Sequence, residues 1–195
     1  MPEVLDEAAQ ALSEGRLIAY PTETFYALGV ACDNKEALRR LFELKGRPEN
    51  KPFPLIAGSV ETIERKVAVV DKPALALGRT HWPGALTILL KAKDGHCSEF
   101  ILNEAGKVAV RIPGESFALA LARRLNYPIT STSANPSGLV PAADAATVVK
   151  YFGTEAIDIV IDGGCTPGGL PSTILEVTAD GRIKILRAGA IQVIP

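Results

Sequence analysis

Apolar residues recur at helical spacing in the first dozen positions of the chain. Leu5, Ala8, Ala9 and Leu12 fall at i, i+3, i+4 and i+7, the stripe that a helix buries on one face. Gly15 follows this stripe, and glycine commonly ends helices because it adopts a left-handed backbone at no steric cost. The pattern therefore predicts a helix that ends just before residue 15.

A short apolar strand is predicted next, from Arg16 to Tyr20. Pro21 should stop this strand, because proline has no N–H for a sheet ladder and fixes its own φ. A polar loop then carries Thr22, Glu23 and Thr24 between two apolar segments. Open α/β sheets usually hold ligands at such strand ends, so this loop is a candidate binding element. The alternative is an ordinary strand-to-turn transition.

Helix and strand patterns alternate along the rest of the chain. A capping box of Asp33 and Glu36 predicts a helix that reaches about Leu44, with Gly46 closing it. Residues 52–57 contain two prolines, which favours an edge or short strand. The other predicted elements are brief helices begun by Ser59 and by Asp71 with Pro73, strands 85–91, 108–112, 129–132 and 157–161, helices 115–125 and 142–152, and a terminal hairpin of 172–177 with 183–186.

This alternation is typical of an α/β protein with a largely buried, mixed sheet. No repeat, linker or low-complexity tract interrupts the 195 residues, so we expect a single domain over residues 1–195. An apolar fraction of 47% with 22% charged residues agrees with a globular fold.

The overall charge narrows the function little, because a formal net charge of −1 predicts neither nucleic-acid nor membrane binding. The first residues are acidic and lack the layout of a signal peptide, and no apolar run approaches the roughly 20 residues of a membrane span. We therefore expect a cytoplasmic protein.

Cys32, Cys97 and Cys165 are odd in number and far apart, which indicates reduced thiols rather than a disulfide framework, a zinc site or a catalytic nucleophile.

The sequence lacks the residues that several common types of active site require. His81 and His96 are the only histidines, and no acidic cluster surrounds either, which argues against a histidine-based zinc site or a Ser-His-Asp triad. The glycine patterns of P-loop and Rossmann nucleotide sites are also absent from the sequence. Any nucleotide must therefore be held in another way.

Positive charge gathers in one short segment. Lys45, Arg47 and Lys51 lie within seven residues that also contain a glycine and a proline. Ammonium and guanidinium groups suit phosphate oxygens, and an anionic ligand would relieve the repulsion between them. The alternative is a solvated charged face, and in either case we expect these side chains to be exposed.

Further polar residues follow predicted strands. Arg111 interrupts an apolar strand, where its guanidinium must either reach solvent or pair with an anion, which could be a neighbouring carboxylate or a ligand. Ser131, Ser133 and Asn135 follow another strand and are either turn formers or ligand contacts. Residues 163–173 are rich in glycine, which suits a flexible loop or backbone amides that approach an anion.

These segments together resemble the signatures of the threonylcarbamoyl-AMP synthase family, the YrdC-like domains. The resemblance lies in Pro-Thr-Glu-Thr-Phe-Tyr-Ala-Leu-Gly at 21–29, Lys-Gly-Arg-Pro at 45–48, Trp-Pro-Gly-Ala-Leu-Thr at 82–87, Val-Arg-Ile-Pro at 110–113, Ser-Thr-Ser-Ala-Asn-Pro-Ser-Gly at 131–138, Asp-Gly-Gly at 162–164, Pro-Ser-Thr at 171–173 and Leu-Arg at 186–187. It implies a twisted mixed sheet flanked by helices, with a concave basic ligand cleft, in the short single-domain form of the family.

The resemblance also implies an activity. Members of the family condense L-threonine, bicarbonate and ATP into threonylcarbamoyl-AMP and pyrophosphate, and a downstream transferase then modifies tRNA. It implies that Lys45 and Arg47 serve catalysis by neutralising phosphate charge, and that Mg²⁺ is held mainly by the phosphates, with no dedicated protein metal site. ATP would contact Lys45, Arg47, Lys51, Ser133, Asn135 and Arg187, and threonine would contact Thr24, Arg111, Ser131 and Ser172.

The chain departs from the family pattern at three alanines. Ala27 stands where glycine is usual, Ala188 follows Arg187 where proline is common, and Ala57 lies near a histidine that contacts threonine in some relatives. The first two bear on loop geometry, and the third removes one substrate contact.

Two other functions stay open on the sequence. One is the carbamoyltransferase of hydrogenase maturation, whose related domain forms a carbamoyl-adenylate. The other is a non-catalytic RNA-binding module, although the scattered aromatic residues do not suggest a stacking platform.

Overall fold

The structure is a computed structural model that describes residues 2–47, 51–93, 97–178 and 180–193. Pro48 and His96, which belong to the sequence predictions, lie outside these ranges. The described helices are α1 (Pro2–Ser13), α2 (Lys35–Lys45), α3 (Val60–Lys66), α4 (Lys72–His81), α5 (Phe117–Leu125) and α6 (Ala145–Phe152), with a 3-10 turn at Glu99–Ile101. The strands are β1 (Ile18–Pro21), β2 (Tyr26–Gly29), β3 (Leu55–Ile56), β4 (Ala68–Val69), β5 (Leu86–Ala92), β6 (Lys107–Arg111), β7 (Ile129–Thr130), β8 (Thr132–Ser133), β9 (Ile159–Val160), β10 (Thr173–Val177) and β11 (Ile183–Arg187).

The helices begin and end where side chains satisfy their terminal backbone groups. Ser59 and Asp71 cap α3 and α4 as predicted, each accepting from the backbone amide three residues on. The cap of α2 is Asn34 and not the predicted Asp33: its side chain accepts from the amide of Ala37. Gly46 ends α2 with φ of 53°, a left-handed conformation that glycine adopts without strain. Local sequence therefore fixed the helices to within a few residues.

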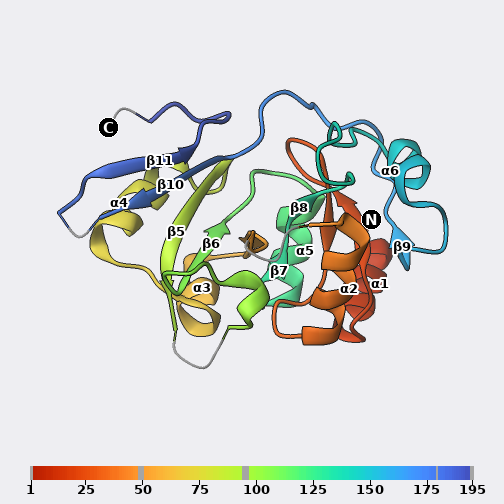
Figure 1. Ribbon diagram of the computed structural model, residues 1–195, viewed down its shortest axis with the longest axis horizontal. Coiled ribbons are helices and arrows are strands. Elements are labelled where there is room, and N and C mark those ends of the chain that lie inside the picture. The colour runs from red at the N-terminus through yellow and green to blue at the C-terminus, as the bar shows by residue number, and fades with distance from the viewer. Residues whose placement is uncertain (1, 48–50, 94–96, 179, 194–195) are drawn as a thin grey trace.

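The strands form two mixed sheets and not the single sheet predicted (Figure 1). The smaller sheet has the order β8-β2-β1-β9, and the larger has the order β11-β10-β5-β6-β3-β7, with β4 beside β5. β3 is short, as expected, but it lies between β6 and β7 and is not an edge. β2 was not predicted as a strand; it forms an antiparallel hairpin with β1 across the Thr22–Phe25 loop.

The two sheets meet where the predicted strand 129–132 divides. β7 pairs with β3 in the larger sheet, whereas β8 pairs with β2 in the smaller one. Ser131 lies between the two strands and donates its backbone N–H to the carbonyl of Pro54 at 2.8 Å. One continuous stretch of chain thus passes from sheet to sheet, and polar residues from both sheets come together at this junction.

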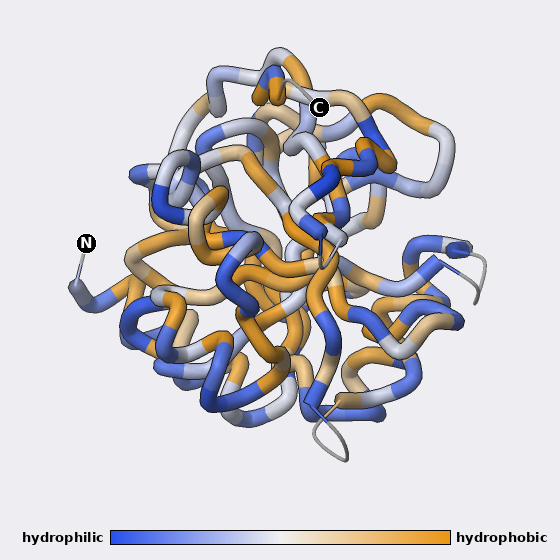
Figure 2. The backbone as a smooth tube through the Cα atoms, turned by 90° about the vertical axis from the view of Figure 1, so that its left-hand side faces the viewer, coloured by the Kyte–Doolittle hydropathy of each residue, from blue (hydrophilic) through white to orange (hydrophobic). Residues whose placement is uncertain are grey.

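Apolar side chains fill the space between the sheets and the helices. Leu17, Leu28, Leu38, Phe53 and Val110 are among the fully buried residues of the larger cluster. A second cluster lies between α1, α5 and the smaller sheet. Figure 2 shows the result, with hydrophobic segments through the middle of the molecule and hydrophilic ones around it. Within the described ranges, none of the helices has the length and apolarity to cross a membrane.

Candidate active site

A cavity of about 340 Å³ lies at the junction of the two sheets. Volumes of roughly 300–1,000 Å³ are usual for small-molecule sites. Its wall includes all but two of the predicted site residues: Thr24, Arg47, Arg111, Ser131, Ser133, Asn135, Ser172 and Arg187. The two exceptions are Lys45 and Lys51. Residues from near both ends of the chain, from Thr22 to Arg187, therefore share one concave surface.

The Thr22–Phe25 loop is held by its own hydroxyl groups. Thr22 Oγ1 donates to the carbonyl of Phe25 at 2.8 Å and accepts from the backbone amide of Thr24 at 3.1 Å. Since a hydroxyl has one hydrogen, Thr24 is the donor in the 3.1 Å contact between the two hydroxyl groups. The lone pairs of Thr24 Oγ1 are then left to accept from a group in the cavity.

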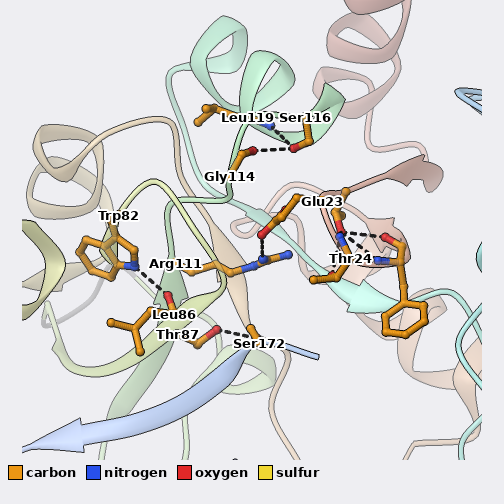
Figure 3. A network of polar contacts seen from close by, with 12 residues as sticks. Glu23, Thr24, Trp82, Leu86, Thr87, Arg111, Gly114, Ser116, Leu119 and Ser172 are labelled. Atoms are coloured by element: carbon orange, nitrogen blue, oxygen red, sulfur yellow. Dashed lines mark hydrogen bonds and ion pairs between the residues drawn. The ribbon is translucent and has the colours of Figure 1, made fainter. Parts of the chain in front are cut away.

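Arg111 ends β6, and its side chain is buried with 8% exposed. Its Nη1 donates to Glu23 Oε1, so the ion pair that the sequence left open is present (Figure 3). Arg111 nevertheless belongs to the cavity wall, whereas Glu23 does not. The geometry is therefore compatible with both partners considered for Arg111, a neighbouring carboxylate and an anionic ligand.

The segment that follows β7 gives the cavity its amide and hydroxyl groups. Asn135 is buried, and its Nδ2 donates at 2.8 Å to the carbonyls of Pro136 and Leu139. Its Oδ1 is buried and has no hydrogen-bond partner within the described ranges. An unpaired buried acceptor is costly, so a ligand that donates to Oδ1 would gain from it.

Lys45 is buried with 3% exposed, and the expectation of an exposed side chain was wrong. Its Nζ donates to the carbonyls of Ser133 at 2.5 Å and Asn135 at 2.8 Å, and its own carbonyl accepts from the amide of Ser137 at 3.1 Å. Desolvation, and then the charge of Arg47, lower the pKa of Lys45 to about 7. The last turn of α2 thereby fastens the cavity segment at three points.

Arg47 and Lys51 have different positions although they are close in sequence. Arg47 is partly buried: its Nε donates to the carbonyl of Lys51 at 2.6 Å, and its guanidinium lies 5.2 Å from the ring centroid of Phe53. It lies in the cavity wall. The side chain of Lys51 is exposed and outside the wall, so of the predicted cationic segment only Arg47 reaches the cavity.

The opposite wall comes from β5, β10 and β11. Arg187 Nη2 donates to Ser172 at its carbonyl at 2.7 Å and at its Oγ at 3.0 Å. Thr87 lies 2.9 Å from Ser172, hydroxyl to hydroxyl, and Trp82 Nε1 donates to the carbonyl of Leu86 at 2.7 Å (Figure 3). Trp82 thus anchors the start of the strand that carries Thr87.

Electrostatic repulsion acts between the arginines of the cavity. Desolvation, and then the charge of Arg187, lower the pKa of Arg47. Desolvation, and then the charge of Arg111, lower the pKa of Arg187. The charged forms of Arg47 and Arg187 are each disfavoured by a neighbouring guanidinium, so a bound anion would relieve this repulsion.

Several backbone amides of the glycine-rich segment 163–173 donate to other groups of the protein. Gly163 N donates to Tyr26 Oη at 3.0 Å, Gly164 N to Asp162 Oδ1 at 3.0 Å, and Gly168 N to the carbonyl of Thr24 at 2.8 Å. These three amides are therefore already paired within the protein and are not available to a bound anion. The last contact ties the segment to the loop that carries Thr24.

The alanines that depart from the family pattern lie in different environments. Ala27 is in β2 and not in a loop, and it lines the cavity. Ala57 is buried, outside the cavity wall, and donates its backbone N–H to the carbonyl of Arg111 at 3.0 Å. Ala188 is exposed after β11.

Some cavity residues were missed by sequence reasoning. Phe25, Thr87 and Pro141 line the cavity, and none was singled out as a candidate contact. A signal existed for Thr87, because it ends the Trp82–Thr87 motif.

Within the described ranges, no group of three His, Cys, Asp or Glu side chains suits a metal ion.

The cysteines provide a test of whether any thiol serves the site. Burial raises the pKa of Cys32 to about 12, which keeps the thiol protonated at neutral pH, and none of the three cysteines lines the cavity. We expect the Cys32→Ala, Cys97→Ser, Cys165→Ser triple variant to keep activity within about twofold and to lose about 1 kcal/mol of stability from the small space left at Cys32. Turnover and urea unfolding measure this, and loss of turnover in the folded variant would reveal an unrecognised nucleophile.

Comparison with known proteins gives consistent matches. A family model named Sua5_yciO_yrdC and described as telomere recombination matches residues 10–189. A threonylcarbamoyl-AMP synthase of Bacillus subtilis is 36% identical over 185 residues, which are 95% of this chain and 53% of that protein. One from Marinobacter nauticus is 34% identical over 177 residues, which are 91% of this chain and 93% of that protein.

A solved structure is also similar over most of the chain. P. abyssi Sua5 complexed with L-threonine has a TM-score of 0.85 and 35% identity, covering 95% of this chain and 54% of that one. The chain thus spans about half the length of the Bacillus relative and of P. abyssi Sua5, but nearly the whole length of the Marinobacter relative.

Proposed function

The chain belongs to the Sua5/YciO/YrdC family, and from that premise we propose that it is an L-threonylcarbamoyl-AMP synthase. The amine of L-threonine and bicarbonate form a carbamate with loss of water. A carbamate oxygen then attacks the α-phosphorus of ATP, and the bond to the β-phosphate oxygen breaks to release pyrophosphate. The product supplies threonylcarbamoyl for modification of tRNA by a downstream transferase.

One observation carries the proposal: the cavity gathers three arginines and a set of hydroxyl and amide groups from separate motifs of the family. Two anionic substrates must be brought together in this reaction, so positioning and positive charge are needed more than a strong base. Arg47 and Arg187 would stabilise phosphate charge, and the unpaired Oδ1 of Asn135 would accept from a hydroxyl or amino group of the nucleotide.

The amino acid would occupy the other part of the cavity. Arg111 would receive its carboxylate, and Thr24, Ser131 and Ser172 would contact its polar groups. The lone pairs of Thr24 Oγ1 suit the hydroxyl of threonine as a donor. Ser133 would contact the nucleotide.

The two lysines of the segment are proposed to act differently from the arginines. Lys45 would act through the segment that it holds, because its ammonium group donates to two backbone carbonyls. A phosphate contact of the exposed Lys51 remains a prediction. Mg²⁺ would reach the site with ATP, held by phosphate oxygens and water.

The experiment supplies ATP, Mg²⁺, bicarbonate and L-threonine, and follows pyrophosphate release together with the adenylate by mass spectrometry. The proposal requires pyrophosphate release that depends on both threonine and bicarbonate. Salt-sensitive RNA binding by a protein that releases no pyrophosphate would favour the RNA-binding alternative instead.

Substrate selectivity is a sharper test of the same site. We expect valine to react at least about 10²-fold less efficiently than threonine, because a substrate without the hydroxyl leaves polar groups of the site unpaired. Comparing kcat/KM for threonine, serine and valine measures this. Equal values for threonine and valine would rule out hydroxyl recognition by Thr24 and its neighbours.

A further inference from the structure

Glu23 is the acidic residue of the Thr22–Thr24 loop, and the proposed function gives it no role. Thr22 and Thr24 line the cavity, but Glu23 does not. Its Oε1 accepts from Arg111 Nη1, and the two side chains are only 16% and 8% exposed. Its other oxygen, Oε2, is buried without a hydrogen-bond partner in the described part of the chain.

The Glu23–Arg111 pair is not expected to add much to the free energy of unfolding. Burying two charges costs desolvation, which is repaid only when the geometry is good and the remaining donors and acceptors are satisfied. Glu23 Oε2 is not satisfied, and the contact with Glu23 is the one hydrogen bond found for the Arg111 guanidinium among the described residues. The pair is therefore better explained by an effect of Glu23 on the orientation of the Arg111 guanidinium.

The stem of Glu23 lies close to Gly114. A Cβ added at Gly114 would lie 3.2 Å from Glu23 Cγ, tighter than an ordinary contact, so the glycine leaves room for this stem. The carbonyl of Gly114 accepts from Ser116 Oγ at 2.8 Å, and Ser116 is the N-cap of α5. Figure 3 shows the Ser116–Gly114 hydrogen bond at the start of α5 and, as a separate contact, the ion pair between Glu23 and Arg111.

Charge distinguishes Arg111 from the other two arginines of the cavity. Arg47 and Arg187 donate to backbone carbonyls, and Arg187 also to a hydroxyl, whereas Arg111 alone of the three has a carboxylate partner in the described ranges. A guanidinium held at one edge keeps its other N–H donors in a fixed plane. Arg111 is thus oriented by an anionic partner, whereas Arg47 and Arg187 are held by neutral ones.

We propose that Glu23 is a positioning residue: it holds one edge of the Arg111 guanidinium so that the remaining donors face the cavity and receive the carboxylate of the amino-acid substrate. This inference rests on the proposed function. It assigns Glu23 no contact with the substrate and no proton transfer. Its effect must therefore appear in amino-acid binding and must pass through Arg111.

The test compares KM for threonine and for ATP in the wild type, Glu23→Ala and Glu23→Gln. We expect Glu23→Ala to raise the threonine KM by roughly 10- to 100-fold, the effect of losing one hydrogen bond to a charged group, with the ATP KM changed less than about twofold. Glu23→Gln keeps an oxygen acceptor for Arg111, so it should restore most of the threonine affinity. A merely structural role would not divide the two KM values in this way.

Two controls separate positioning from general damage. Glu176→Ala removes the carboxylate of another partly buried pair, in which Lys107 of β6, the strand of Arg111, meets Glu176 of β10, and both members lie outside the cavity wall. It should leave the threonine KM unchanged. In the Arg111→Ala background, adding Glu23→Ala should change the threonine KM no further, because a residue that acts through Arg111 has nothing left to position.

A normal threonine KM in active Glu23→Ala, an equal rise in both KM values, or additive effects in the double variant would overturn the positioning role and leave the proposed function intact. A wild type without threonine-dependent pyrophosphate release would overturn the proposed function and this inference with it. If Glu23→Ala does not fold, Glu23→Asp decides: its shorter carboxylate should raise the threonine KM, and a wild-type value would overturn the inference.

Discussion

Arg47→Ala is expected to lower threonine-dependent pyrophosphate release by roughly 10²-fold, the scale of removing one electrostatic stabiliser. Arg47 is the cation of the Lys45–Lys51 segment that reaches the cavity, and it already repels Arg187. Its guanidinium is fixed by the carbonyls of Lys51 and Pro52 and by the ring of Phe53, so it can stabilise developing phosphate charge without reorganising. Steady-state kinetics with saturating ATP measure the loss.

Matched variants identify the property of Arg47 that matters. Arg47→Lys keeps the charge but loses the planar fork, so an intermediate rate is expected. Arg39 also lies over an aromatic ring, 6.0 Å from the centroid of Phe100, but it is exposed and outside the cavity wall. Arg39→Ala should therefore keep full activity. If Arg47→Ala were as active as Arg39→Ala, Arg47 would not carry phosphate stabilisation.

Lys45→Met is expected to lower turnover by a similar factor, roughly 10²-fold, for a different reason. The ammonium does not line the cavity; it holds the carbonyls of Ser133 and Asn135, and small misplacements of positioned groups are expensive in catalysis. Methionine has a similar length and fills the same space without donating. Steady-state kinetics of the folded variant measure the loss, and a normal rate would show that the segment keeps its position without Lys45.

The stability of the Lys45→Met variant should depend on pH in a defined direction. The pKa of Lys45 is about 7 in the folded chain against 10.5 for the ordinary side chain, so the unfolded chain binds more protons between these values. The unfolding free energy of the wild type should therefore rise relative to that of the variant as pH increases from about 7 to about 10. Urea unfolding at several pH values measures the difference. A constant difference would mean that Lys45 titrates normally.

Much of this protein follows from local sequence. The spacing of apolar residues gave the helices, and Ser59 and Asp71 cap them as expected because capping joins residues three positions apart. The position of the Thr22–Thr24 loop was likewise predictable, since Pro21 ends the ladder of β1. The motifs of the family also identified most of the residues that line the cavity, because each motif carries its own polar groups.

The tertiary structure alone decided which partners these residues meet. Lys45 and Arg47 are two positions apart and look alike in sequence, yet one is buried against carbonyls 88 and 90 residues away while the other lies in the cavity wall. The same holds for Glu23, which reaches Arg111 88 residues further on, and for the strand that divides at Ser131 between two sheets. Local propensity sets the path of the backbone over a few residues. The direction, burial and charge partner of a long side chain depend on segments that only folding brings beside it.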